Sequence, residues 1–164
     1  PSFQGMIARN RLATESNELL LAINLARSEA SRAGQIFSLQ ADNAVNGNEF
    51  GGGYCVVLGN PGDCPGEGDP NYDLVVRAFS ALSAGTTLSG VSDILNGGAW
   101  GIPRSSIQFG ALGALSGTNN QLRNIDLCLQ GQRGYRIQIA LIGRVKSWRE
   151  AESGSPIPPV QPNC

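Results

Sequence analysis

The chain has 164 residues, a formal net charge of −1 and a charged fraction of 15%, and these totals exclude several classes of protein. Histidine is absent, so the commonest general base and the commonest metal ligand are both missing. Neither a G-x-S-x-G nucleophile motif nor a Walker loop occurs. We therefore expect a protein that is not an enzyme, with no catalytic residue, no metal site and no cofactor. No segment reaches the roughly 20 apolar residues that span a bilayer.

The first predicted element is a long helix over Phe3–Ala33, a stretch that contains no proline and a single glycine. Gly34 predicts the left-handed residue that ends it. Opposite charges three or four residues apart can pair on its solvent side, in Arg11–Glu15 and Glu29–Arg32. Residues that recur at alternating steps of four and three form its inner face: Leu12, Ser16, Leu19, Ile23, Ala26, Ala30 and Ala33.

The length of this helix has a consequence for assembly. A helix of about 30 residues is roughly 45 Å long, whereas a small domain spans roughly 30 Å. One end should therefore protrude or meet another subunit. The segment Leu19–Ala26 is apolar nearly all the way round. One of its sides can lie on a sheet, and the other needs a further cover, such as a neighbouring subunit's helix.

After Gly34 the hydrophobic period shortens toward two, which predicts strands joined by loops. A short strand at Ile107–Phe109 is expected to lie at a sheet edge. Gly143 is expected to bend the chain into the last strand. The other expected strands are Ile36–Ala41, Tyr54–Leu58, Leu74–Phe79, Ile125–Leu129, Tyr135–Ile142 and Arg144–Trp148, with loops at Asp42–Gly53 and Gly59–Asp73.

One long helix followed by strands predicts an α+β fold in which the helix packs on a mostly antiparallel sheet or sheets. The length suits one domain over residues 1–164. Within it we expect the helix at 1–34, a β-sheet body at 35–152 and a proline-rich tail at 153–164.

The four cysteines, Cys55, Cys64, Cys128 and Cys164, fit no zinc-binding spacing and predict two disulfides in an oxidising compartment. Four cysteines allow three pairings. We favour Cys55–Cys64, which closes a glycine-rich loop, and Cys128–Cys164, which ties the tail to a strand. In the loop-entropy model these two contribute roughly 3 and 4 kcal/mol.

Two clusters of charge each allow a functional and a structural interpretation. Four acidic residues, Asp63, Glu67, Asp69 and Asp73, make a calcium site conceivable, but their spacing is not that of an EF-hand and we favour a solvated loop. The last third of the chain contains five basic residues that could form a phosphate-binding patch for DNA or a polar sheet face: Arg123, Arg133, Arg136, Arg144 and Lys146. We favour the sheet face.

The run Arg9–Ala33 resembles the helix of the GspH/FimT family of minor pilins and pseudopilins. The matching positions in it are Asn10, Arg11, Leu20, Leu25, Ala26, Arg27, Ser28, Glu29 and Ala30. The two-cysteine loop of Cys55 and Cys64 is also similar to the family's. So are the isoleucine-rich strand and the following Gly143-Arg144-Val145-Lys146 step. The resemblance covers most of the chain and is weakest at 42–53 and 80–106.

The resemblance implies a pilin-like fold and a filament subunit whose partners are other minor and major pilins. It further implies a periplasmic domain whose full-length form is held in the inner membrane by an apolar N-terminal helix. The implied role is that of a minor pilin of the FimU type, which primes a type IV pilus and stays near its tip. A GspH-like subunit of the type II secretion pseudopilus and a FimT-like DNA-binding pilin are the alternatives. We expect the assembly contact on the helix, at Leu12, Leu19, Leu20, Ile23, Ala26 and Ala30.

Overall fold

The computed structural model describes residues 3–45, 47–92, 105–117, 123–149 and 164. Its first element is the predicted helix, α1, which spans Phe3–Ala33 without interruption. Gly34 ends the helix with a φ of +66°, and its N–H donates to the Ala30 carbonyl at 3.0 Å. The uninterrupted helix over Phe3–Ala33 and its glycine stop are therefore confirmed.

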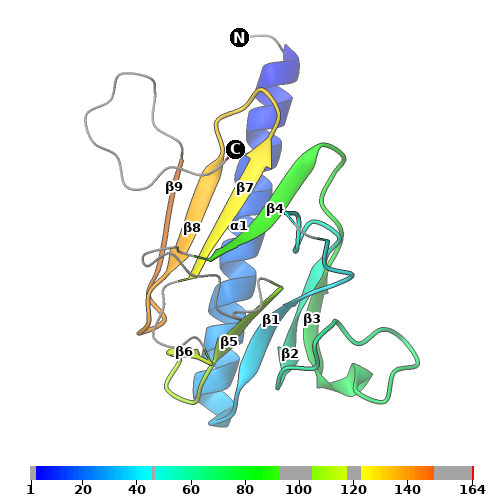
Figure 1. Ribbon diagram of the computed structural model, residues 1–164, viewed down its shortest axis with the longest axis vertical. Coiled ribbons are helices and arrows are strands. Elements are labelled where there is room, and N and C mark those ends of the chain that lie inside the picture. The colour runs from blue at the N-terminus through cyan, green and yellow to red at the C-terminus, as the bar shows by residue number, and fades with distance from the viewer. Residues whose placement is uncertain (1–2, 46, 93–104, 118–122, 150–163) are drawn as a thin grey trace.

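Two antiparallel sheets follow the helix (Figure 1). The five-stranded sheet has the order β3-β2-β1-β5-β6 and the four-stranded sheet the order β4-β7-β8-β9. A short 3-10 helix, Tyr72–Leu74, precedes β3. The strands are β1 Phe37–Ala41, β2 Tyr54–Leu58, β3 Val75–Phe79, β4 Thr86–Ser92, β5 Ser106–Phe109, β6 Leu115–Ser116, β7 Arg123–Leu129, β8 Tyr135–Ile139 and β9 Val145–Arg149.

One hydrophobic core joins the helix to both sheets. Six of the seven inner-face residues of α1 are buried, and only Ala33, in the last turn, is exposed. Alternate residues of the strands meet that face, including Leu39 and Ile107 from the first sheet and Ile125 and Ile137 from the second. The α+β fold with its helix on mostly antiparallel sheets is confirmed, because every strand pairing in the described residues is antiparallel.

Two predictions about strands were wrong, and two strands were not predicted. The strand at 107–109 is not an edge, because β5 lies between β1 and β6. The strand predicted to run to Ile142 ends at Ile139, where a turn begins in which the Gly143 N–H donates to the Ala140 carbonyl. Neither β4 nor β6 was predicted. β6 has only two residues, which is too short for a detectable period.

β4 has a weak sequence signal because its residues, TTLSGVS, are small and include Gly90. Hydrogen bonds to neighbouring segments hold β4 in the sheet, although its own side chains have little preference for a strand. β4 pairs along its whole length with β7. On its other side the segment 47–50 acts as a partial strand: the Phe50 N–H donates to the Leu88 carbonyl, and the Leu88 N–H donates to the Asn48 side-chain oxygen at 2.7 Å. The buried Glu49 carboxylate accepts a hydrogen bond from the Gly90 N–H.

Both favoured disulfides are present. Cys55, on β2, bonds to Cys64 in the following loop across a sequence separation of 9 residues. Cys128, on β7, bonds to Cys164 across a separation of 36 residues. The last residue is therefore held against the second sheet. The rest of the predicted proline-rich tail, residues 153–163, lies outside the described residues.

A candidate assembly surface on helix α1

The six residues predicted to form the assembly contact do not lie on a free surface. Leu20 is partly buried, and the other five have no exposed surface at all: Leu12, Leu19, Ile23, Ala26 and Ala30. The expectation is corrected in this respect, because the periodic apolar face of α1 packs against the chain's own sheets. A partner that binds α1 has to contact the opposite face.

That opposite face, which we call the outer stripe, occupies a sector of about 100° at the helical rotation of about 100° per residue. It contains four large apolar side chains, of which Phe3 is 75% exposed and Leu21 is 49% exposed. The outer stripe is made of the exposed residues of this sector from Phe3 to Ser28, and its other members are neutral and polar. Arg32 lies in the same sector one turn beyond Ser28, so a partner that stops before Arg32 could cover the outer stripe without desolvating a charge. The outer stripe consists of Phe3, Met6, Ile7, Asn10, Thr14, Asn17, Leu21, Asn24 and Ser28.

Two hydroxyl groups of the outer stripe are already hydrogen bonded within the helix. The Thr14 hydroxyl donates to the Asn10 carbonyl at 3.0 Å, and the Ser28 hydroxyl donates to the Leu25 carbonyl at 3.0 Å. Such bonds satisfy the hydroxyl groups on their own backbone. The cost of removing water from these two hydroxyl groups is correspondingly low, since a buried polar group is expensive only when it lacks a partner.

The N-terminal end of α1 extends beyond the sheets, as Figure 1 shows. No residue within 3–11 is buried, and Leu12 is the first residue that joins the core. These nine residues correspond to roughly 13 Å of helix. They carry three exposed apolar side chains, because Met6 and Ile7 are each 53% exposed and Phe3 lies one turn earlier. The prediction that one end of the helix protrudes is confirmed.

The two predicted charge pairs on α1 both form, but in different surroundings. Arg32 pairs with Glu29 at 2.5 Å on the solvent side, as expected, and this raises the pKa of Arg32. Arg11 pairs with Glu15 at 3.3 Å, and here the expectation of a solvent-side position is wrong. Glu15 is only 8% exposed, because the chain that follows β3 covers it.

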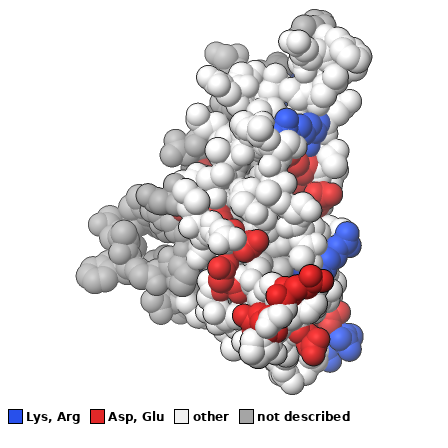
Figure 2. Space-filling model, turned by 90° about the vertical axis from the view of Figure 1, so that its right-hand side faces the viewer, with Lys and Arg blue, Asp and Glu red and all other residues white. Residues whose placement is uncertain are grey.

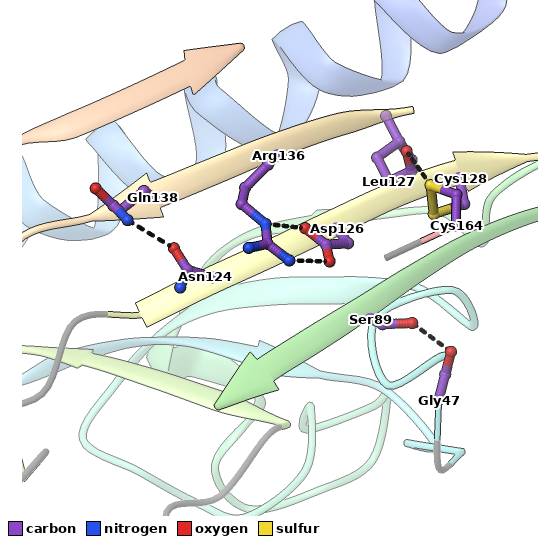
Figure 3. A network of polar contacts seen from close by, with 9 residues as sticks. All are labelled: Gly47, Ser89, Asn124, Asp126, Leu127, Cys128, Arg136, Gln138 and Cys164. Carbon is purple, nitrogen blue, oxygen red and sulfur yellow. Dashed lines mark hydrogen bonds and ion pairs between the residues drawn. A yellow bond between two sulfur atoms is a disulfide. The ribbon is translucent and has the colours of Figure 1, made fainter. Parts of the chain in front are cut away.

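The five basic residues predicted as a DNA-binding patch are not gathered on one surface. Arg136 and Arg123 are buried, at 3% and 5% exposure. Arg136, on β8, forms a two-pronged ion pair with Asp126 of β7, with both N···O distances at 2.6 Å (Figure 3). Arg123 donates to the Ser106 carbonyl, and burial lowers its pKa to about 10. These two guanidinium groups face inward and cannot belong to an exposed phosphate-binding patch.

Arg144, in the turn before β9, and Lys146, on β9, are exposed. Arg133 is partly buried in the turn between β7 and β8. Figure 3 shows that the polar pairing continues along β7 and β8, where Gln138 donates to the Asn124 side chain at 3.2 Å. Cross-strand pairs of this kind stabilise sheets. The arrangement agrees with the polar sheet face, the alternative that was favoured.

The acidic loop lies on the side of the molecule drawn in Figure 2, where acidic side chains gather over the lower part of the surface. Its four carboxylates are all exposed: Asp63, Glu67, Asp69 and Asp73. Asp63 accepts hydrogen bonds from the N–H groups of Asn43 and Cys64, and Asp69 accepts one from Asn71. In the part of the chain that is described, no three carboxylates or thiols are grouped to hold a metal ion.

Among the described residues, no helix is both long enough and apolar enough to cross a membrane. The apolar side chains of α1 occupy its inner face and short parts of the outer stripe, with polar or charged residues between them. The inner face of the helix packs against the chain's own sheets.

Comparison with known proteins gives one family and a set of similar structures. The family model described as Type II transport protein GspH matches residues 15–143. The type IV minor pilin FimU of Pseudomonas aeruginosa has a similar structure, with a TM-score of 0.60 and 22% identity over 86% of this chain and 90% of that chain. The minor pseudopilin EpsH of the Vibrio cholerae type 2 secretion system has a TM-score of 0.56 and 14% identity, over 87% and 99%. No curated protein sequence is significantly similar.

Proposed function

The chain belongs to the GspH family of minor pilins and pseudopilins, and on this premise we propose that it is a non-enzymatic filament subunit that joins other pilins through the outer stripe of α1. The observation that carries the proposal is a long helix with one face in its own core and an uncharged, partly apolar face left exposed. Helices with two such faces pack in bundles, because each face can meet a different neighbour.

Burial of the outer stripe would contribute part of the free energy of assembly. Complete burial of a large apolar side chain contributes about 1.5–3 kcal/mol. Phe3, Met6, Ile7 and Leu21 are 75%, 53%, 53% and 49% exposed. Covering what remains exposed of the four would contribute about 3–7 kcal/mol in total. Association itself costs about 4 kcal/mol or more, so the outer stripe contributes to assembly together with other contacts and does not by itself keep an isolated pair of subunits together.

The test is a variant that changes the outer stripe and leaves the core untouched. In Ile7→Asn combined with Leu21→Asn, two half-exposed apolar side chains become polar. We expect assembly with partner pilins to weaken about 10- to 100-fold, while the free energy of unfolding stays within about 0.5 kcal/mol of the wild type. Assembly is measured as incorporation into filaments in cells that lack the wild-type gene, and stability by urea unfolding of the purified chain.

Leu112→Asn is the matched control, because Leu112 is a leucine that is 91% exposed in the turn between β5 and β6 and lies outside α1. It should assemble like the wild type. If the outer-stripe variant were incorporated as well as this control, the helix would not be the assembly surface.

Of the two filament types, we propose the type IV pilus, with this chain as a priming minor pilin at the tip. The resemblance of 9–33 is to the helix of minor pilins and pseudopilins alike. The choice is supported by the somewhat higher identity to the minor pilin FimU, 22%, than to the pseudopilin EpsH, 14%. The pseudopilus of type II secretion is the second candidate, and the description of the matching family model favours it. Deletion of the gene separates the two. Loss of surface pili with normal protein secretion supports the pilus, whereas loss of secretion with normal pili supports the pseudopilus.

A further inference from the structure

A groove of about 460 Å³ runs beside the outer stripe, between α1 and the chain that follows β3. Thr14 belongs to both the outer stripe and the groove. A helix that packs along the outer stripe would therefore bring its side chains to the mouth of the groove. One wall consists of Arg11, Thr14, Glu15 and Glu18, and the other of residues 77–83.

Glu15 is the unusual residue of this groove. Its side chain is 9% exposed, and one carboxylate oxygen, Oε1, accepts hydrogen bonds from Arg11 and from the Ser83 hydroxyl at 3.1 Å. The other oxygen, Oε2, is buried and has no hydrogen-bond partner. A buried carboxylate oxygen without a donor is costly, and buried polar groups in native proteins nearly always find a partner. The carboxylate thus lacks a donor on one side.

Arg11 does not supply that donor. Its Nη2 is directed away from Glu15 to the start of β4, where it donates to the Ala84 carbonyl at 2.9 Å and to the Thr86 hydroxyl at 3.0 Å. Only its Nε reaches Glu15, at 3.3 Å, so the pair is single-pronged. A bidentate arginine–carboxylate pair, by contrast, has two parallel hydrogen bonds.

Glu18 adds a second carboxylate one turn further along the same wall, and it is exposed. The negative charges of the two carboxylates reach Tyr54. The pKa of Tyr54 is raised mainly by burial and to a smaller extent by the charges of Glu18 and Glu15. The basic residue of the opposite wall is Arg77, whose guanidinium carbon lies 4.9 Å from the centre of the Phe79 ring. The ring's attraction for a cation holds Arg77 on its own wall.

We propose that this groove receives an arginine or lysine side chain of a neighbouring subunit, with Glu15 and Glu18 as its ion-pair partners; the proposal rests on the assembly role of α1 given above. A cationic donor suits the site because charge-assisted hydrogen bonds are the strongest that a carboxylate accepts. Oε2 is buried in the present conformation, so pairing with an incoming cation requires rotation about the soft terminal torsion of the glutamate.

The test uses a small probe and NMR spectra of the folded chain. Nα-acetyl-arginine amide is titrated into the isotope-labelled protein, and its citrulline counterpart, which has the same shape without the charge, is the control probe. We expect saturable shifts of the backbone amide signals at 14–18 and 77–83 with the arginine probe alone. No saturable shift there, or equal shifts with both probes, would overturn the proposal.

Variants of the groove residues then test whether the groove selects a positively charged probe. Glu18→Gln, at an exposed position, should weaken binding of the arginine probe about tenfold, and Glu15→Gln by as much or more. Glu29→Gln is the matched control on the same helix, because Glu29 pairs with Arg32 outside the groove. Arg77→Gln should strengthen binding by removing a competing cation. Weaker binding in Arg77→Gln, or unchanged binding in Glu18→Gln, would show that the groove does not select cations.

The outer-stripe variant separates this proposal from the assembly proposal. Ile7→Asn combined with Leu21→Asn should bind the arginine probe like the wild type, because neither residue lines the groove. If that variant fails to assemble while the wild-type groove does not bind the probe, the groove proposal alone is refuted. If the probe binds the groove and the variant assembles normally, the assembly role of the outer stripe is refuted.

Discussion

The buried ion pair between Asp126 and Arg136 allows a prediction about stability that can be worked out from its geometry. The two side chains are 1% and 4% exposed, and two parallel hydrogen bonds of 2.6 Å join them across β7 and β8. In Asp126→Ala the guanidinium of Arg136 stays buried but loses its carboxylate. The native state then carries a charge that the unfolded chain would solvate.

Breaking a buried pair by removing one partner typically costs about 3–5 kcal/mol, because the remaining charge stays buried without its ion-pair partner. For a chain of 164 residues, a loss of 1 kcal/mol lowers the melting temperature by about 2–4 °C. We therefore expect Asp126→Ala to melt about 6–20 °C below the wild type. Replacing both residues by apolar ones, Asp126→Leu with Arg136→Met, should cost clearly less than the sum of the two single replacements.

Thermal unfolding gives the melting temperature and urea unfolding the free energy of unfolding, both followed by circular dichroism with both disulfides intact. Glu29→Ala is the control, because it breaks an ion pair that lies in solvent and should leave the unfolding midpoint nearly unchanged. A loss below about 1 kcal/mol in Asp126→Ala would refute the reasoning. Strict additivity of the two single replacements would also refute it, since the pair would then contribute no coupling energy.

Three further predictions concern the disulfides, alkaline pH and DNA. Replacing Cys128 and Cys164 by alanine should destabilise the chain about 1 kcal/mol more than replacing Cys55 and Cys64, because the first disulfide closes a loop of 36 residues and the second a loop of 9. Urea unfolding of the two variants measures the difference. Equal losses of stability would contradict the loop-entropy explanation. Burial raises the pKa of Tyr54, so the native state keeps a proton that the unfolded state loses above about pH 10. Stability should therefore fall as the pH rises through 10, and less so in Tyr54→Phe; parallel pH profiles would show that Tyr54 is not the group responsible. Of the five basic residues at 123–146, only Arg133, Arg144 and Lys146 have substantial exposed surface. Any binding of DNA through them should lose affinity with salt at a log–log slope no steeper than about −2.7, measured by gel shift, and a steeper slope would mean that other cations take part.

The sequence predicted much of the architecture, and particular residues explain why. The inner face of α1, the glycine that ends the helix and the strands around Val56 and Ile137 depend on spacing along the chain, which a periodic pattern records directly. The disulfide pairs were also predicted, because one loop is short and the other cysteine is at the end of the chain. β4 was missed, since the groups that hold it, Glu49 and Asn48, lie some 40 residues away in the chain.

The candidate site was only partly predictable. A helical period shows which residues share a face, but it does not show how much of that face remains for a partner once the chain's own sheets cover it. The apolar residues from Leu12 to Ala30 were assigned both to the inner face and to the assembly contact, and the tertiary structure uses them for the core. The same limit applies to the basic residues. In the sequence Arg136 and Arg144 are equivalent cations, whereas the fold buries one against Asp126 and exposes the other.

What the chain determines by itself is therefore its local order: a rod with one periodic apolar face, β-prone segments and cysteines at spacings that suit loops. What only the tertiary structure decides is which polar groups become neighbours. Glu15 and Ser83 lie 68 residues apart in the chain and meet only because the segment after β3 folds back over α1. Charges and hydrogen bonds act over a few ångströms in space, and the spacing of two residues along the chain does not give the distance between them in the folded protein.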